Sequence, residues 1–345
     1  MRTFHNMLNR TRPFSLILIV LFSILLLQTF YIPAYGLSSA GKAPRIRFAD
    51  IRFLGASPVY VALEKGYFSQ EGLEIAHTFY SVGKDCLGAV VSGKADIAFV
   101  ADYPIAFEIM KGTKILVITT LSNQSNTHEI IARRNQGIAS PEDLQGKKIG
   151  VTLGTNLQFV LDSFLLFHQV PRDHIQLINL PAERMEEALQ KREIDAAILW
   201  GPTLIKMKRN LGKDAVVFEA NPPYIFRETL NIVAKEEFIR QNPATIKALL
   251  RALLKADNFI QGDREEALQI AAKYMEMKIQ TLRESWKIVR PNVSLNPLLV
   301  ENLENESKWA LKNSLTKATQ MPNFLDYIYF DGLDSVRPDA VTIIH

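Results

Sequence analysis

Short apolar runs alternate along most of the chain with longer segments in which apolar residues recur every three or four positions. Runs of the first kind predict buried strands, and segments of the second kind predict amphipathic helices. The predicted strands span residues 45–49, 73–79, 97–100, 115–119, 129–133, 148–151, 175–179, 196–199 and 216–218. Strands that alternate with helices in this way favour an α/β fold with mostly parallel sheets.

The last third of the chain has a mainly helical pattern. Asn242 and Pro243 stand where a helix cap and a first helical residue are expected. Further on, Leu282, Trp286 and Val289 follow helical spacing and predict one more helix.

A helix–turn–strand pattern occurs twice, at Leu87–Ala98 and at Glu187–Ala197. Asp96 and Asp195 occupy the same place in the two copies, at the turn before a buried strand. A short carboxylate at such a turn can accept hydrogen bonds from nearby backbone N–H groups. Two like units about a hundred residues apart indicate two like lobes.

The segment Pro58–Ile75 carries a motif with fixed spacing. Its pattern is P-x-x-x-A-x-x-x-G-Y-F followed by E-G-L-x-I, and Gly66 stands where a helix would end in a left-handed residue. The residues in register are Pro58, Ala62, Gly66, Tyr67, Phe68, Glu71, Gly72, Leu73 and Ile75. In this motif the chain resembles the substrate-binding proteins of bacterial ABC importers for nitrate, sulfonates, taurine and thiamine-precursor pyrimidines.

The resemblance implies a two-lobed type II periplasmic-binding-protein fold with a ligand cleft between the lobes. In such a fold the chain crosses between the lobes twice, and we expect these crossings near Glu129–Arg133 and Thr229–Lys235. Lobe 1 would then comprise residues 43–131 plus 232–345, and lobe 2 residues 132–231.

The first 40 residues have the composition of a targeting segment. They contain three arginines and no acid, and an uncharged run, Phe14–Ile32, is followed by small residues. We expect a secretory signal peptide or, alternatively, an uncleaved membrane anchor; both predict an extracytoplasmic location.

Without these three arginines, 37 of the 40 basic residues remain against 36 acidic residues, so no nucleic-acid partner is expected. The single cysteine, Cys86, allows no intrachain disulfide.

Candidate ligand-binding residues follow the predicted strands, because open α/β sheets bind ligands at the carboxyl ends of their strands. Gly154, Thr155 and Asn156 form a turn at a helix start that can hold an oxyanion with backbone N–H groups. Asp102 and Tyr103 follow another strand, and a carboxylate there suits an amine better than an anion. For the turn at Gly154 and for Asp102, helix capping is the alternative interpretation.

The remaining candidates are Ser57, Trp200, His128 and Arg227. Ser57 starts the first helix and is a ligand donor or a cap. Trp200, at the end of a strand, offers a stacking surface, with a place in the core as the alternative. His128 and Arg227 lie near the two crossings, and a structural role is the alternative for His128.

The sequence thus predicts a binding protein that closes two lobes on a small polar solute and delivers it to the permease of an ABC importer. Neither a G-x-S-x-G nor a phosphate-binding loop motif occurs, and no cofactor, no metal and no enzymatic activity are expected. We expect a monomer that touches the membrane through the permease or an uncleaved leader. The alternatives are a ligand-sensing lobe for a separate signalling partner and a pyrimidine-synthesis enzyme of the same fold. A basic residue closing on the Gly154 turn would favour an anionic solute over an amine or aminopyrimidine.

Overall fold

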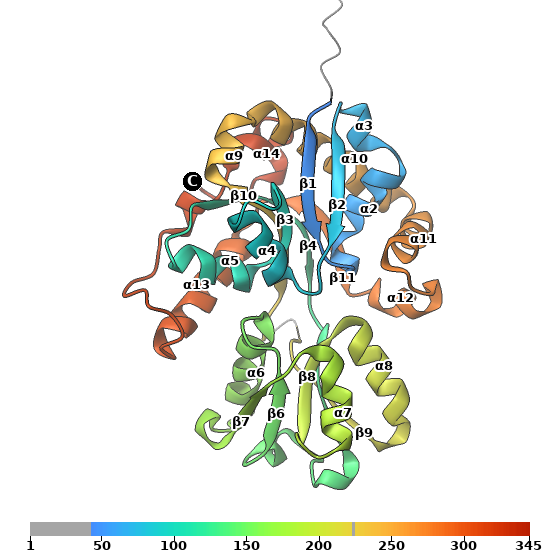
Figure 1. The fold of residues 1–345 in the computed structure, drawn as a ribbon, viewed down its shortest axis with the longest axis vertical. Coiled ribbons are helices and arrows are strands. Elements are labelled where there is room, and N and C mark those ends of the chain that lie inside the picture. Colours follow the sequence, from blue (N-terminus) through green and yellow to red (C-terminus); the bar gives the residue numbers. More distant parts are fainter. Residues whose placement is uncertain (1–42, 223–224) are drawn as a thin grey trace, which may run out of the picture. The chain divides into compact units, whose positions relative to one another are not determined.

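The computed structural model describes residues 43–222 and 225–345, with two lobes that each contain one sheet (Figure 1). The expected signal peptide or anchor lies outside the described residues. Within the described part of the chain, no helix combines the length and the apolar character that crossing a membrane requires.

The first sheet has six strands in the order β11-β4-β10-β3-β1-β2. In chain order they are β1 (Arg45–Asp50), β2 (Glu74–Phe79), β3 (Ile97–Ala101), β4 (Ile115–Gln124), β10 (Glu228–Lys235) and β11 (Val289–Ser294). The second sheet has five strands in the order β7-β6-β8-β5-β9. These are β5 (His128–Arg133), β6 (Lys148–Val151), β7 (Gln176–Asn179), β8 (Ala196–Trp200) and β9 (Ala215–Glu219).

The two sheets follow one plan. In the first, β2, β1 and β3 are parallel neighbours, and β10 then pairs antiparallel between β3 and β4. In the second, β7, β6 and β8 are parallel neighbours, and β5 pairs antiparallel between β8 and β9. The strands β10 and β5 each arrive from the other sheet. Both sheets contain parallel and antiparallel pairs and are covered by helices, which confirms the mixed α/β class. Among the described residues four pairings are parallel and five antiparallel, so the expected dominance of parallel pairing is corrected.

The helices also divide between the two lobes. Those of the first lobe are α2 (Ser57–Glu64), α3 (Tyr67–Gln70), α4 (Gly83–Val91), α5 (Asp102–Met110), α9 (Glu236–Gln241), α10 (Pro243–Gly262), α11 (Arg264–Met275), α12 (Ile279–Ser285), α13 (Pro297–Lys312) and α14 (Phe330–Asp334). The second lobe has α6 (Asn156–Phe167), α7 (Met185–Gln190) and α8 (Gly201–Leu211). Neighbouring residues of β5 point to opposite faces, so Ile130 joins the core beneath α6 and Ile131 the core beneath α7 and α8.

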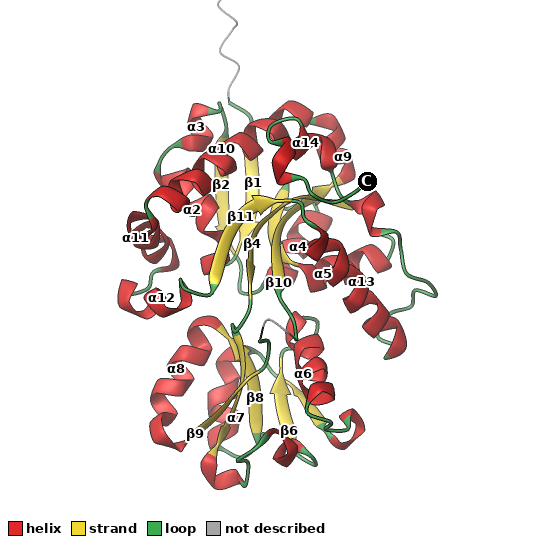
Figure 2. Ribbon diagram, turned by 180° about the vertical axis from the view of Figure 1, so that it is seen from behind, coloured by secondary structure: helices red, strands yellow, loops and turns green. Residues whose placement is uncertain are grey.

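All nine predicted strands occur, most of them with ends that differ by one or more residues. Gly66 has a φ of 68°, which confirms the left-handed stop after the first helix. Asn242 is the N-cap residue of α10 and Pro243 its first residue, as predicted. Two helix details are wrong. Asn242 makes no side-chain capping bond, because its side-chain amide donates to the carbonyl of Phe238. Val289 begins β11, and α12 ends at Ser285; Figure 2 shows β11 beside β4.

The crossings lie slightly earlier than expected. The first passes from β4 to β5 at residues 125–127, and the second from β9 to β10 within residues 220–227. The strand β5 spans the predicted domain limit at residue 131, and all of it pairs in the second sheet. The domain limits themselves stay a prediction.

Candidate functional site

A small cavity lies where loops of both sheets meet. It encloses about 40 Å³ and is lined largely by residues at the carboxyl ends of β1, β3, β6 and β8 and at the start of α4. The lining residues are Ile51, Phe53, Val82, Gly83, Lys84, Ala101, Pro104, His128, Thr155, Asn156, Trp200, Glu228 and Leu230. One water needs roughly 10–15 Å³, so an organic solute is admitted only when the lining moves apart.

The turn after β6 faces a lysine from the first lobe. The Lys84 ammonium donates to the carbonyl of Leu153 at 3.0 Å. Gly154 has a φ of 76°, and a Cβ added there would lie 3.7 Å from Lys84 Nζ. The turn therefore needs glycine for its left-handed backbone. Lys84 is the kind of basic residue on this turn that favours an anionic solute.

The helix α6 begins at this turn, with Thr155 as its extended N-cap. The Thr155 hydroxyl donates to the carbonyl of Thr152 at 2.7 Å and makes no capping bond to the helix. Thr155 and Asn156 both line the cavity. The uncapped N-terminus of α6 thus adds the positive end of a helix dipole to the charge of Lys84.

His128 and Asn156 meet at the wall of the cavity. Asn156 Nδ2 lies 3.0 Å from His128 Nε2, and Thr127 Oγ1 lies 3.1 Å from His128 Nδ1. An amide nitrogen can only donate, so His128 accepts at Nε2 and carries its proton at Nδ1. Burial lowers the pKa of His128 to about 4, which keeps the ring neutral near pH 7.

Glu228, at the start of β10, is the acid of the cavity. Its carboxyl group accepts from Gln124 Nε2 at 2.6 Å and from the amide of Asn156. Burial, and then repulsion from Asp102, raise the pKa of Glu228 to about 8. Glu228 is therefore largely protonated near pH 7 and does not repel an anion as a carboxylate would.

Trp200 ends β8 and is half-buried at the cavity. It pairs with His128 across β8 and β5, and the two ring centroids lie 6.3 Å apart. It lines the cavity from a strand end, and its role as a stacking surface stays a prediction.

Asp102 and Tyr103 do not line the cavity, although Ala101 and Pro104 on either side of them do. Asp102 is fully buried and accepts from the backbone N–H of Thr229 at 2.8 Å and from Asn302 Nδ2 at 2.6 Å. Glu306 lies next to Asp102 and keeps its proton, because burial and the neighbouring Asp102 raise its pKa. Tyr103 packs against Phe107, with ring centroids 4.5 Å apart. Both candidates therefore lie outside the cavity lining.

Ser57 and Arg227 are also outside the lining. The Ser57 hydroxyl is buried and donates to the carbonyl of Leu54 at 2.6 Å. Ala56, not Ser57, occupies the cap position of α2. The Arg227 side chain is exposed, and its carbonyl accepts from Asn302 at 2.7 Å. The structure thus brings together His128, Thr155, Asn156 and Trp200, with Gly154 at the edge.

Sequence reasoning missed Lys84 and Glu228. Lys84 follows a glycine at the start of α4, and only the fold shows that this helix end meets the turn at Gly154. Glu228 lies next to the candidate Arg227, near the second crossing, and no local pattern marks its side chain as part of a site. No group of three or more metal-binding side chains occurs within residues 43–222 and 225–345.

Comparison with known proteins gives several relatives. A binding protein of Brucella abortus is 25% identical over 227 residues, which cover 65% of this chain and 69% of that protein. The taurine-binding periplasmic protein of Escherichia coli is 24% identical over 206 residues, 58% of this chain and 62% of that protein. A 4-amino-5-hydroxymethyl-2-methylpyrimidine phosphate synthase of Aspergillus parasiticus is 23% identical over 234 residues, 64% of this chain and 67% of that protein.

Among solved structures, the periplasmic aliphatic sulphonate binding protein SsuA of Escherichia coli matches with a TM-score of 0.70. It is 18% identical, and the match covers 84% of this chain and 98% of that one. This likeness establishes the two-lobed periplasmic-binding-protein fold. The family described as NMT1/THI5 like matches residues 55–267, more than half of the chain. The chain therefore belongs to the NMT1/THI5-like family.

Proposed function

We propose that this chain is the extracytoplasmic solute-binding protein of an ABC importer and that its solute carries an anionic group. The two lobes would close on the solute and deliver it to a membrane permease. Binding proteins among the relatives support this role, and the basic composition and apolar run of residues 1–40 support export.

The observation that carries the proposal is the position of Lys84. Its ammonium, from the first lobe, lies against the Gly154 turn and the N-terminus of α6 in the second lobe. An oxyanion placed there would meet a full positive charge and the positive end of a helix dipole. Neutral His128 and protonated Glu228 leave that charge uncompensated within the cavity lining.

The solute class follows from this charge. A sulfonate, nitrate or bicarbonate group fits the Lys84 end, whereas an aminopyrimidine offers it no anion. A zwitterion such as an aminosulfonate also fits, because its ammonium group could pair with Glu228 once that acid loses its proton.

The test compares Lys84→Gln with Lys94→Gln, in which an exposed lysine just beyond the same helix loses its charge. Purified protein is titrated calorimetrically with taurine, alkanesulfonates, nitrate, bicarbonate and an aminopyrimidine. An anion should bind the parent and Lys94→Gln alike and bind Lys84→Gln at least tenfold more weakly, a difference of about 1.4 kcal/mol. Tight binding of the aminopyrimidine alone, unaffected by Lys84→Gln, would overturn the anionic assignment.

The similarity to the pyrimidine phosphate synthase favours the enzymatic alternative. Cys86, the single cysteine, is buried, and burial raises the pKa of its thiol. A buried, protonated thiol does not support nucleophilic or metal-binding chemistry.

A sensor lobe for a separate signalling partner would use the same cavity, and the titration above applies to it unchanged.

A further inference from the structure

Three carboxyl groups from different elements lie buried together where the first lobe meets the second. Asp102 starts α5, Glu228 starts β10 and Glu306 belongs to α13. Asp102 and Glu306 are completely buried, and Glu228 is 3% exposed. Away from water a carboxylate charge is costly unless donors surround it, so the donors at each group decide which of the three is charged.

The hydrogen-bond donors are divided unequally within this carboxyl cluster. Asp102 accepts hydrogen bonds of 2.6–3.0 Å from the backbone N–H groups of Tyr103 and Thr229, from the Thr229 hydroxyl and from Asn302 Nδ2. No donor among the described residues reaches either oxygen of Glu306. Asp102 therefore holds the negative charge of this pair, and Glu306 holds the proton and donates to Asp102.

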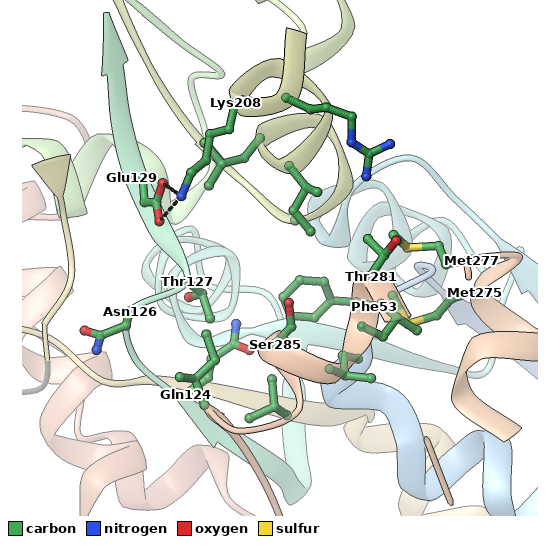
Figure 3. A pocket seen from close by; sticks show the side chains of 18 residues that line it. Phe53, Gln124, Asn126, Thr127, Glu129, Lys208, Met275, Met277, Thr281 and Ser285 are labelled. Carbon is green, nitrogen blue, oxygen red and sulfur yellow. Dashed lines mark hydrogen bonds and ion pairs between the residues drawn. The ribbon is translucent and has the colours of Figure 1, made fainter. Parts of the chain in front are cut away.

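Glu228 has two donors, and one of them belongs to the other lobe. Gln124 Nε2, at the end of β4, lies 2.6 Å from one carboxyl oxygen, and the amide of Asn156 in α6 reaches the other. Gln124 also lines a wider pocket of about 400 Å³, where Figure 3 shows it beside Asn126 and Thr127 of the first crossing. Gln124 Oε1 is buried and has no hydrogen-bond partner among the described residues. With its amide rotated end for end, Gln124 offers this oxygen as the acceptor that a protonated Glu228 needs.

The proton of Glu228 depends on the contact between the lobes. With the lobes together, burial and the charge of Asp102 raise the pKa of Glu228 to about 8, although the hydrogen bonds from Gln124 and Asn156 lower it. With the lobes apart, Glu228 would face water, and its pKa would return toward the ordinary value of 4.5. Because burial is the largest of these effects, bringing the lobes together takes up a proton.

The other titratable groups around Glu228 leave this balance in place. His128 of β5 is neutral near pH 7, because burial lowers its pKa to about 4. Lys84 of α4 donates to a backbone carbonyl in the turn after β6. Arg227 precedes Glu228 in the chain, and its side chain is exposed. Since Glu306 already holds its proton, Glu228 is the member of the carboxyl cluster that changes charge near neutral pH.

We propose that Glu228 is a proton switch for the arrangement of the two lobes. The protonated side chain holds α6 of the second lobe against the first lobe through Asn156, and loss of the proton separates the lobes. The switch works without a solute and so does not depend on which solute the protein binds. An anion near Lys84 would favour protonated Glu228, so anion binding and proton uptake would strengthen each other.

The test measures the distance between the lobes without solute by single-molecule fluorescence energy transfer. The dyes are attached to Ala244→Cys in α10 and Gln190→Cys in α7, which are both exposed positions, whereas Cys86 is buried. With a pKa of 8 for the lobes together and 4.5 for the lobes apart, the ratio of closed to open molecules should fall about fiftyfold between pH 6 and pH 8.

Glu228→Gln has a neutral side chain at every pH, so its ratio of closed to open molecules should stay constant over this range. Glu306→Gln is the matched control, because it replaces a carboxyl group of the same cluster that already holds its proton, and it should keep the fall seen in the parent. In the parent, the infrared band of a protonated carboxyl group should disappear as the molecules open, which tests the switch without a substitution at Glu228. A ratio that does not change with pH in the parent, or a fall that persists in Glu228→Gln, would overturn the proposal.

Discussion

At the scale of single residues, Glu228 has the least expected chemistry. It receives hydrogen bonds from Gln124 of β4 and from Asn156 of α6, so it connects the two lobes. Its pKa of about 8 results from burial and from nearby Asp102. Because Glu228 is protonated, it makes this contact between the lobes without the free-energy cost of burying a charged carboxylate.

This pKa predicts a pH dependence. Above its ordinary pKa of 4.5 the unfolded chain releases the Glu228 proton, whereas the folded protein keeps it until about pH 8. The stabilising contribution is therefore complete below pH 4.5 and is lost as the pH rises to 8. Glu228→Gln removes this contribution, so the parent should lose thermal stability relative to Glu228→Gln between pH 5 and 8.5. If the melting temperatures of the two proteins changed equally with pH over that range, Glu228 would be ionised in the folded protein and the prediction would be wrong.

The residues of the cavity differ in how far the sequence reveals them. Trp200 stands directly after an apolar run, and Asn156 stands at the start of the amphipathic helix after β6, so their places at a strand end and a helix start follow from the pattern alone. Asp102 stands in an equivalent place, yet its side chain turns to Thr229 and Asn302, which lie 127 and 200 residues further along the chain. Such distant partners leave no local pattern, and for the same reason Lys84 was missed.

At the scale of elements, the repeated helix–turn–strand unit gives each lobe the same connection. Asp96 accepts from the backbone N–H of Arg47 in β1 at 2.8 Å, and Asp195 accepts from that of Lys148 in β6 at 2.8 Å. In both lobes the aspartate before a strand therefore joins the start of that strand to its parallel neighbour. The prediction from the sequence is confirmed, although the donors lie on neighbouring strands.

This equivalence predicts a pair of similar stability losses. Asp195→Ala should lower the free energy of unfolding by about 1–2 kcal/mol, because it leaves a backbone donor without its partner. Asp96→Ala should lower it more, since Asp96 also pairs with the Arg47 guanidinium at 2.5 Å. Urea denaturation followed by circular dichroism measures both. A variant at exposed Asp173 serves as control, and equal stability of all three variants and the parent would contradict the assigned role.

The strands β10 and β11 show the limit of pattern reading at this scale. The strand β11 contains Arg290 and Pro291 and lies at the edge of its sheet, where a residue without an N–H is tolerated. Its apolar residues are too few to stand out from helical spacing. The strand β10 is almost entirely buried, but half of its residues are polar or charged, and the sequence indicates it only as the crossing between lobes.

At the scale of the whole described chain, Trp309 of α13 connects the lobes through its contacts with α6. Its indole N–H donates to Asp162 of α6 at 3.1 Å. Its ring centroid lies 5.6 Å from that of Phe159 of α6 and 5.9 Å from that of Tyr103 of α5. The same helix α6 supplies Thr155 and Asn156 to the cavity, so this contact helps to place both side chains.

Trp309→Ala should therefore shift the molecule toward a more open arrangement. Apparent affinity falls in proportion to the population of the binding-competent state, so a solute that binds the cavity should bind about three- to tenfold more weakly. Small-angle X-ray scattering should show a larger radius of gyration for Trp309→Ala than for the parent without solute, and saturating solute should remove the difference. Trp309→Phe keeps an aromatic ring and loses only the hydrogen bond, so its effect should be intermediate. If both variants match the parent in scattering and in affinity, the two crossings and the cavity contacts alone hold the lobes together.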